Sequence, residues 1–257
     1  MDLFSQIDWQ QPWYSPWADV GRDVANAMSG GLPGGVPVFA ALNQVAQARQ
    51  IDCPQFVPQS ALEAGRAYES HVAAHWQCPT RDNLHDYFNG LCWLQFPQTK
   101  ARLNQLQSAQ IQRDGVQSRR GPVRDAITLL DESAALLSAP EPLWQALIAK
   151  DWHQLFITLR PLWADARLML FGHASLERLI SPRKPMVSHV YRAQHAINFE
   201  SMSIAALDHA LAEDLNATHL AGKPFAPLPL MGVPGWCAAN SDAAFYTDAQ
   251  VFRQPSS

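Results

Sequence analysis

Residues 79–107, PTRDNLHDYFNGLCWLQFPQTKARLNQLQ, carry the pattern that decides the fold class of this chain. Asp82 is a residue type that caps helices, and the apolar-rich stretch after it predicts a helix over 83–96. Pro97 has no backbone N–H and a fixed φ, so it ends that helix and suits the first turn of a second helix over 97–111. The stretch therefore predicts two consecutive helices, joined as a hairpin or by a kink.

Apolar residues at helical spacing predict further helices on both sides of this stretch. We expect them at residues 17–29, 37–46, 60–76, 143–150, 151–159, 173–180 and 200–216. Residues 55–57, between two prolines, are expected to be extended.

A β-hairpin is predicted where two β-prone runs flank a polar turn. The runs are 126–130 and 134–137, and the turn is Asp131-Glu132-Ser133. The fold class expected from these patterns is mainly α (α+β), a helical domain with a small β-hairpin or short antiparallel sheet.

The composition supports a globular chain. Its 257 residues are 47% hydrophobic and only 16% charged, which supplies enough apolar material for a core. Many chains of this length fold around one core, so we expect a single domain over 1–257. The Pro-rich, aromatic segment 224–253 has apolar residues between its prolines and is predicted to be an extended arm docked on that core.

Charge and hydropathy limit the partners and the location. The net charge of −4 gives no overall attraction to nucleic acid or to an anionic membrane. Asp2 and Asp8 stand where a signal peptide would carry positive charge. No run approaches the roughly 18 apolar residues that a membrane helix needs. Four cysteines without a Cys-x-x-Cys pair predict free thiols. We therefore expect a soluble, cytoplasmic protein with no membrane partner.

Two predicted helices each carry polar residues one turn apart. His85 and Asn89 share a face, with Asp86 beside Asn89, and His173 and Glu177 repeat the spacing. If the two helices face each other, the two imidazoles and the carboxylates of Asp86 and Glu177 provide ligands for a divalent metal. The alternative is that these side chains only cap helices or satisfy nearby backbone groups.

The only strongly basic segment lies within residues 100–124. Guanidinium groups bind carboxylate or phosphate through two hydrogen bonds, so Arg119 and Arg120 are candidates for holding an anionic substrate, together with Asn89. Asp125 is a candidate catalytic carboxylate beside them. The alternative is that these charges pair with acidic neighbours and fix local structure.

Several of these stretches resemble a known family. They are 79–107, RRGPVRDAITLLDE at 119–132, FGHASLE at 171–177, PLPLMGVPGW at 227–236 and FYTDAQVF at 245–252. Together they resemble a proteobacterial family catalogued as a domain of unknown function, number 3025, over about residues 54–253. The resemblance implies one domain and a bacterial intracellular setting, and it implies no activity, cofactor or catalytic residue.

Three functions are compatible with these patterns. The first is a hydrolase-like enzyme acting on an anionic substrate, either with a divalent metal or with His85 or His173 as a general base. The second is a non-catalytic binding or scaffold protein with a Trp-rich surface. The third, which the overall charge does not favour, is a nucleic-acid binder using residues 100–124. The distance between the His85 and His173 rings separates the first two.

Overall fold

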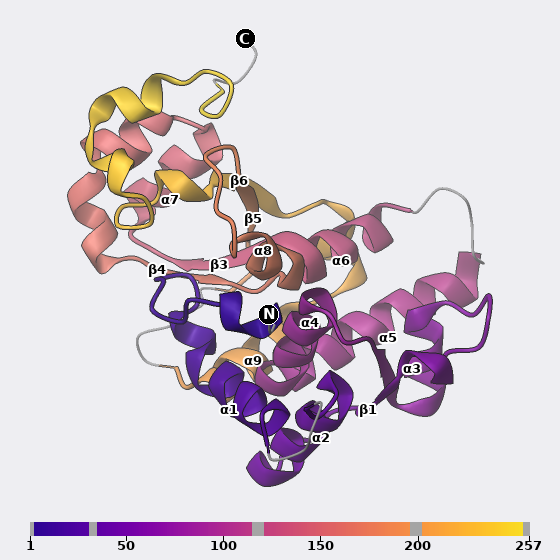
Figure 1. The fold of residues 1–257 in the computed structure, drawn as a ribbon. Helices are drawn as coiled ribbons and strands as arrows, with labels where there is room; N and C mark the ends of the chain where they lie inside the picture. The colour runs from indigo at the N-terminus through magenta and orange to yellow at the C-terminus, as the bar shows by residue number, and fades with distance from the viewer. Residues whose placement is uncertain (1–2, 31–34, 115–120, 196–201, 254–257) are drawn as a thin grey trace.

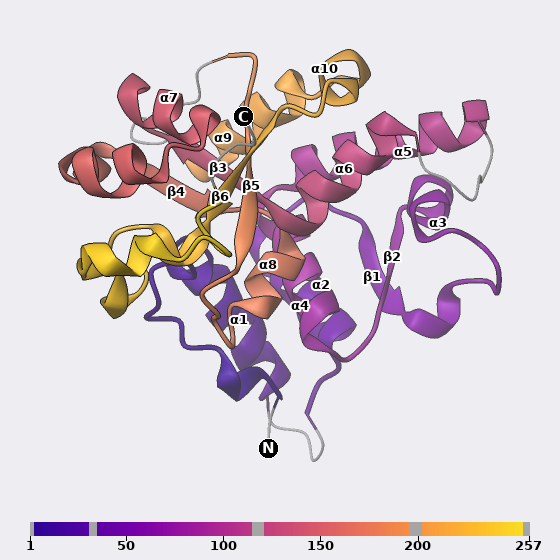
Figure 2. The same cartoon turned by 90° about the horizontal axis from the view of Figure 1, so that it is seen from above.

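The computed structural model describes residues 3–30, 35–114, 121–195 and 202–253 (Figures 1 and 2). Its α-helices are α1 (Ala18–Met28), α2 (Val38–Arg49), α3 (Tyr68–His75), α4 (Leu84–Gln95), α5 (Pro97–Asp114), α6 (Pro122–Ser133), α7 (Glu141–Ala149), α8 (His173–Arg178), α9 (Ile204–Asp214) and α10 (Ala217–Ala221). Its strands are β1 (Gln55–Pro58), β2 (Gln77–Thr80), β3 (Ala134–Ser138), β4 (Arg167–Leu170), β5 (Val187–Tyr191) and β6 (Phe225–Pro229). Its 3₁₀ and π turns are η1 (Leu3–Gln6), η2 (Ser15–Trp17), η3 (Gln59–Ala61), η4 (Gln154–Thr158), η5 (Arg160–Asp165), η6 (Leu230–Gly232), η7 (Ala238–Ser241) and η8 (Ala243–Thr247). The fold is mainly α with some β, as the sequence predicts.

Within the described ranges, the strands form two small sheets. β1 and β2 pair in parallel. The second sheet has the order β4-β3-β5-β6, in which β3 is antiparallel to β4 and parallel to β5, and β5 is antiparallel to β6. The β structure is therefore two sheets with parallel as well as antiparallel pairs, and not the one small hairpin or short antiparallel sheet expected from the sequence. The pairings join strands that are distant in the chain, which local sequence patterns do not reveal.

The predicted hairpin at 126–137 is wrong. Its first run belongs to α6, whose buried residues are Val123, Ala126, Ile127 and Leu130, at the three- and four-residue spacing of a helix face. Pro122 occupies the first turn, where its missing N–H costs nothing. Only the second run forms a strand, β3. Asp131 and Glu132 consequently lie in the last turn of a helix and not in a β-turn.

The predicted helix over 60–76 is also too long. Gly65 has φ +82°, a left-handed conformation that interrupts a helix, and α3 begins only at Tyr68. The two helices of 79–107 are confirmed as α4 and α5, but the cap of α4 is Asn83, whose side chain accepts a hydrogen bond from the Asp86 backbone N–H at 2.8 Å. Asp82 instead accepts from the backbone N–H of Val38 at the start of α2, also at 2.8 Å.

The core surrounds α4, which packs against α1, α2, α5, α8 and α9. Its central residues Tyr87, Phe88, Leu91 and Cys92 are fully buried. The C-terminal segment lies with α7 at one end of the molecule, and α3 with β1 and β2 lies at the opposite end (Figures 1 and 2). None of the helices in the described ranges is long and apolar enough to cross a membrane.

Candidate functional site

The packing of α8 against α4 brings two histidines together. His85 lies in the first turn of α4 and His173 is the first residue of α8. Their Nε2 atoms are 3.1 Å apart, and their ring centroids are 4.6 Å apart. The two rings therefore meet edge to face, with one nitrogen of each directed at the other.

Gly172 permits the close approach of α8 to the end of α6. A Cβ atom on Gly172 would lie 2.3 Å from the backbone nitrogen of Ser133 and 2.5 Å from the carbonyl carbon of Glu132. Every residue type other than glycine would push the two segments apart. The glycine in FGHASLE thus places His173 next to the acidic end of α6.

Glu132 completes a group of three side chains with metal-ligand atoms. One nitrogen from each of His85 and His173 and one Glu132 carboxylate oxygen all lie within 4.8 Å of one another. Glu132 Oε2 is 3.7 Å from His173 Nε2. His173 is almost completely buried, whereas His85 and Glu132 are partly exposed, so the group is open to solvent on one side.

The other nitrogen of each imidazole faces a carboxylate. His85 Nδ1 is 2.9 Å from Glu177 Oε2, and His173 Nδ1 is 3.8 Å from Asp131 Oδ2. Asp131 is held by the buried ammonium of Lys100, which also donates to Asn89 Oδ1 at 2.8 Å. A carboxylate hydrogen-bonded to an imidazole, as Glu177 is to His85, orients a metal-binding ring and raises its basicity. Asp131 is too far from His173 Nδ1 for a hydrogen bond in this structure.

Burial and neighbouring charges shift the pKa values of three side chains in and beside this group. Burial lowers the pKa of His173 to about 4, so its imidazole is neutral at neutral pH. Burial is the largest influence on the pKa of Asp131 and raises it, but the charge and hydrogen bond of Lys100, together with His173 and His85, outweigh burial and place the pKa below its ordinary value. Burial, followed by the Asp131 charge, raises the pKa of Glu132. A cation placed beside Glu132 would relieve the cost of ionising it.

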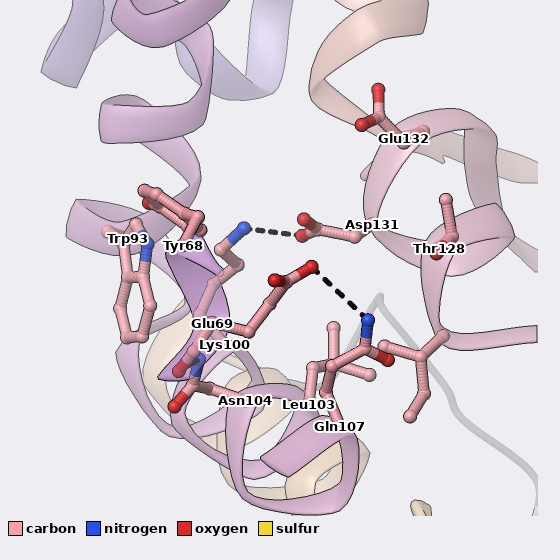
Figure 3. A pocket seen from close by; sticks show the side chains of 11 residues that line it. Tyr68, Glu69, Trp93, Lys100, Leu103, Asn104, Gln107, Thr128, Asp131 and Glu132 are labelled. Atoms are coloured by element: carbon pink, nitrogen blue, oxygen red, sulfur yellow. Dashed lines mark hydrogen bonds and ion pairs between the residues drawn. The ribbon is translucent and has the colours of Figure 1, made fainter. Parts of the chain in front are cut away.

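A pocket of about 140 Å³ lies beside this group (Figure 3). Residues of α6 form one side, and residues of α3, α4 and α5 form the other. The lining residues are Tyr68, Glu69, Trp93, Lys100, Leu103, Asn104, Gln107, Ile127, Thr128, Asp131 and Glu132. Because Glu132 belongs both to the pocket wall and to the histidine group, a molecule in the pocket lies next to the candidate ligands.

The structure brings together some of the side chains expected from the sequence. His85, His173 and Glu177 meet, and within the described residues Asn89 reaches them through Lys100 and Asp131.

Other expected side chains lie elsewhere. The Asp86 carboxylate accepts from the Arg81 backbone N–H at 2.6 Å and from the Arg81 guanidinium at 2.9 and 3.0 Å, so it is committed to the start of α4. Asp125 is exposed and lies 3.6 Å from the ammonium of Lys223. Arg119 and Arg120 fall outside the described residues.

Glu132, Asp131 and Lys100 were not among the site residues proposed from the sequence. The sequence places the two acids in a turn, because the β-prone residues before them predict a strand where the structure has α6. Once α6 is recognised, they stand in its last turn, where the helix dipole disfavours carboxylates. Two acids at that unfavourable position, with no basic residue in the same turn, are a signal that something else stabilises them.

Comparison with known proteins shows the family to which this helical protein belongs. A family model described as "Protein of unknown function (DUF3025)" matches residues 54–256, which is most of the chain. The chain belongs to this family, and the residues of the histidine group all lie in the matched region. No curated protein and no solved structure matches the chain.

Proposed function

We propose that the protein is a metal-dependent hydrolase whose divalent ion is bound by His85, His173 and Glu132. The observation that carries the proposal is the arrangement of the imidazole nitrogens. A proton on His85 Nδ1 suits Glu177, and a proton on His173 Nδ1 suits the Asp131 carboxylate, which lies 3.8 Å away, beyond hydrogen-bond distance. Protons in these positions leave an unshared electron pair on each Nε2. Those two Nε2 atoms lie 3.1 Å apart, and a cation between them would relieve the repulsion of their electron pairs.

The spacing fits a tetrahedral ion. Zinc–nitrogen bonds of about 2.0–2.1 Å separate two nitrogen ligands by about 3.3 Å, close to the observed 3.1 Å. The Glu132 oxygen, 3.7 Å from His173 Nε2, needs only a small side-chain adjustment. In the absence of an ion the two nitrogens share one proton. When His173 carries that proton, an unshared pair on its Nδ1 faces the Asp131 carboxylate. When His85 carries it, an unshared pair on His85 Nδ1 faces Glu177, and either arrangement is unfavourable.

Three protein ligands leave a fourth position of a tetrahedral ion for water, as in catalytic zinc sites. An ion so held lowers the pKa of its water and polarises a carbonyl or phosphoryl oxygen. The pocket bounded by Glu132 provides a place for a substrate next to that water. In this proposal Glu177 is not a ligand, because it holds the far nitrogen of His85.

The other functions considered have weaker support. Two of the basic residues in 100–124 are occupied inside the fold: Lys100 is buried against Asp131, and Arg102 donates to the Leu215 carbonyl at 3.0 Å. Large exposed apolar side chains in the described ranges are Trp76, Ile148 and Ile204. They stand on or beside three separate elements, α3, α7 and α9.

The metal content of the purified protein tests the proposal. We expect the wild-type chain, incubated with zinc, manganese and magnesium and then desalted, to retain stoichiometric zinc. The double variant His85→Ala, His173→Ala should lose it, because two of three ligands are gone. The double variant His153→Ala, His209→Ala, which changes two exposed histidines, should retain it. A wild-type protein that holds no metal, or a double His85/His173 variant that holds as much as wild type, would reject the site.

A further inference from the structure

The pocket beside the histidine group has an uneven charge. Its described lining contains three carboxylates, from Glu69, Asp131 and Glu132, and one ammonium, from Lys100. Lys100 is already paired with Asp131, bonded to Asn89 and placed over the Trp93 ring, 5.5 Å from its centroid. An anionic ligand would therefore find no unoccupied cation among the described lining residues.

Glu69 is an acid of the lining with unused bonding capacity among the described residues. In that part of the chain its carboxylate accepts one hydrogen bond from another side chain, from Gln107 Nε2 at 3.2 Å, and Figure 3 shows it projecting into the space between α5 and α6. Ionised carboxylates offer about four acceptor sites. The Glu69 backbone carbonyl is engaged separately, by Asn104 at 3.0 Å and Ser108 at 3.5 Å, so the position of Glu69 does not depend on its side chain.

Two buried polar atoms of the lining lack partners in the described part of the chain. They are Gln107 Oε1, an acceptor, and Trp93 Nε1, a donor, and both residues are 2% exposed. A buried polar atom without a hydrogen bond costs free energy, and a ligand is one source of the missing partner. This observation is independent of the pocket charge and also points to a bound molecule.

We infer that the pocket receives a protonated amine of the substrate, bound by Glu69 and Gln107, with a carbonyl-type oxygen of the same molecule accepting from Trp93. The inference rests on the proposed function, since the bond to be cleaved then lies at His85, His173 and Glu132. It names a substrate class of small amine-bearing amides or esters. This charge is opposite to the anionic substrate that the basic segment suggests from sequence.

Three small amides that differ in charge test the inference. Glycinamide carries an ammonium group, acetamide carries none, and malonamate carries a carboxylate. Binding to the zinc-loaded full chain is measured by NMR titration of the Trp93 indole N–H signal, assigned with Trp93→Phe, and by calorimetry. The variants are Glu69→Gln and, as a matched control, Glu63→Gln, an exposed acid near the same helix that pairs only weakly with Arg66 at 3.4 Å.

We expect glycinamide to bind at least about tenfold more tightly than acetamide or malonamate, equivalent to about 1.4 kcal/mol. Glu69→Gln should remove this preference and Glu63→Gln should keep it. The inference is overturned if glycinamide does not bind, if malonamate binds as tightly, or if Glu69→Gln leaves the preference intact.

Repeating the titration on metal-free protein separates the two proposals. If the protein retains zinc but does not bind the amine more tightly, the pocket inference is contradicted and the metal site is still supported. An amine preference that depends on Glu69 in a protein that never binds zinc supports the pocket and rejects the metal site.

Discussion

Among single residues, Glu177 holds Nδ1 of His85 at 2.9 Å. Replacing it with glutamine keeps the shape but removes the charge that makes the imidazole a better ligand. We expect Glu177→Gln to weaken zinc binding by about 10- to 100-fold in a chelator competition assay. Its thermal stability should change little, because the side chain is 37% exposed. The exposed acid variant Glu141→Gln serves as control, and equal zinc affinity in all three proteins would show that Glu177 does not support a ligand.

Gly172 is the residue on which the assembly of the group depends. Because a Cβ there would overlap the backbone of α6, Gly172→Ala should lower the free energy of unfolding by about 1–3 kcal/mol and also weaken zinc binding, since His173 follows directly. Gly121→Ala is the matched control, because a Cβ at Gly121 meets no atom within 4 Å. Chemical denaturation and zinc titration measure both effects. A Gly172→Ala protein with wild-type values in both would contradict the close approach described here.

At the scale of elements, the ion pair between Lys100 and Asp131 joins α5 to α6. Removing one partner of a buried pair leaves an uncompensated charge, whereas replacing both with apolar residues does not. We expect Lys100→Met to lower the free energy of unfolding by roughly 3 kcal/mol, and Lys100→Met with Asp131→Leu to recover most of that loss. Urea denaturation of the two variants measures the difference. A double variant less stable than Lys100→Met would contradict this account of the pair.

The elements also show how far the sequence predicts this fold. Asn83 and Pro97 mark the starts of α4 and α5 through local chemistry, so these starts could be predicted to within a residue, although the sequence favours Asp82 as the cap. The run 126–130 is β-prone by composition, yet it forms a helix because one face packs in the core, and tertiary contacts outweigh intrinsic propensity.

The candidate site could also be predicted only in part, because tertiary contacts determine where some of its residues lie. The four-residue spacing of polar side chains on two predicted helices predicts His85, His173 and Glu177 as site residues. Glu132 and Asp131 cannot be recognised as site residues when 126–137 is predicted to be a hairpin, and the sequence does not distinguish Lys100 from the other basic residues of 100–124. Its burial depends on the packing of α5 on α6, which no local pattern encodes.

At the scale of the whole molecule, the C-terminal segment contributes Leu230, Tyr246 and Phe252 to the buried core, and Tyr246 and Phe252 pack around Phe156. We propose that this segment is required for stability. Ending the chain after Pro234 keeps β6 but removes Tyr246 and Phe252, whose burial contributes about 2–3 kcal/mol each. The melting temperature should fall by roughly 10 °C or more, and Phe252→Ala should reproduce part of the fall. Unchanged melting of both variants in calorimetry would show that the segment is dispensable.

Binding of one divalent ion by His85, His173 and Glu132 can be observed in a crystal structure of the zinc-loaded protein with anomalous data at the zinc absorption edge. The account predicts an anomalous peak between the two Nε2 atoms, with zinc–nitrogen distances of about 2.0–2.1 Å and a Glu132 oxygen at about 2.0–2.2 Å. A map with no peak there, with the two imidazoles still 3.1 Å apart as in the structure described here, would contradict it.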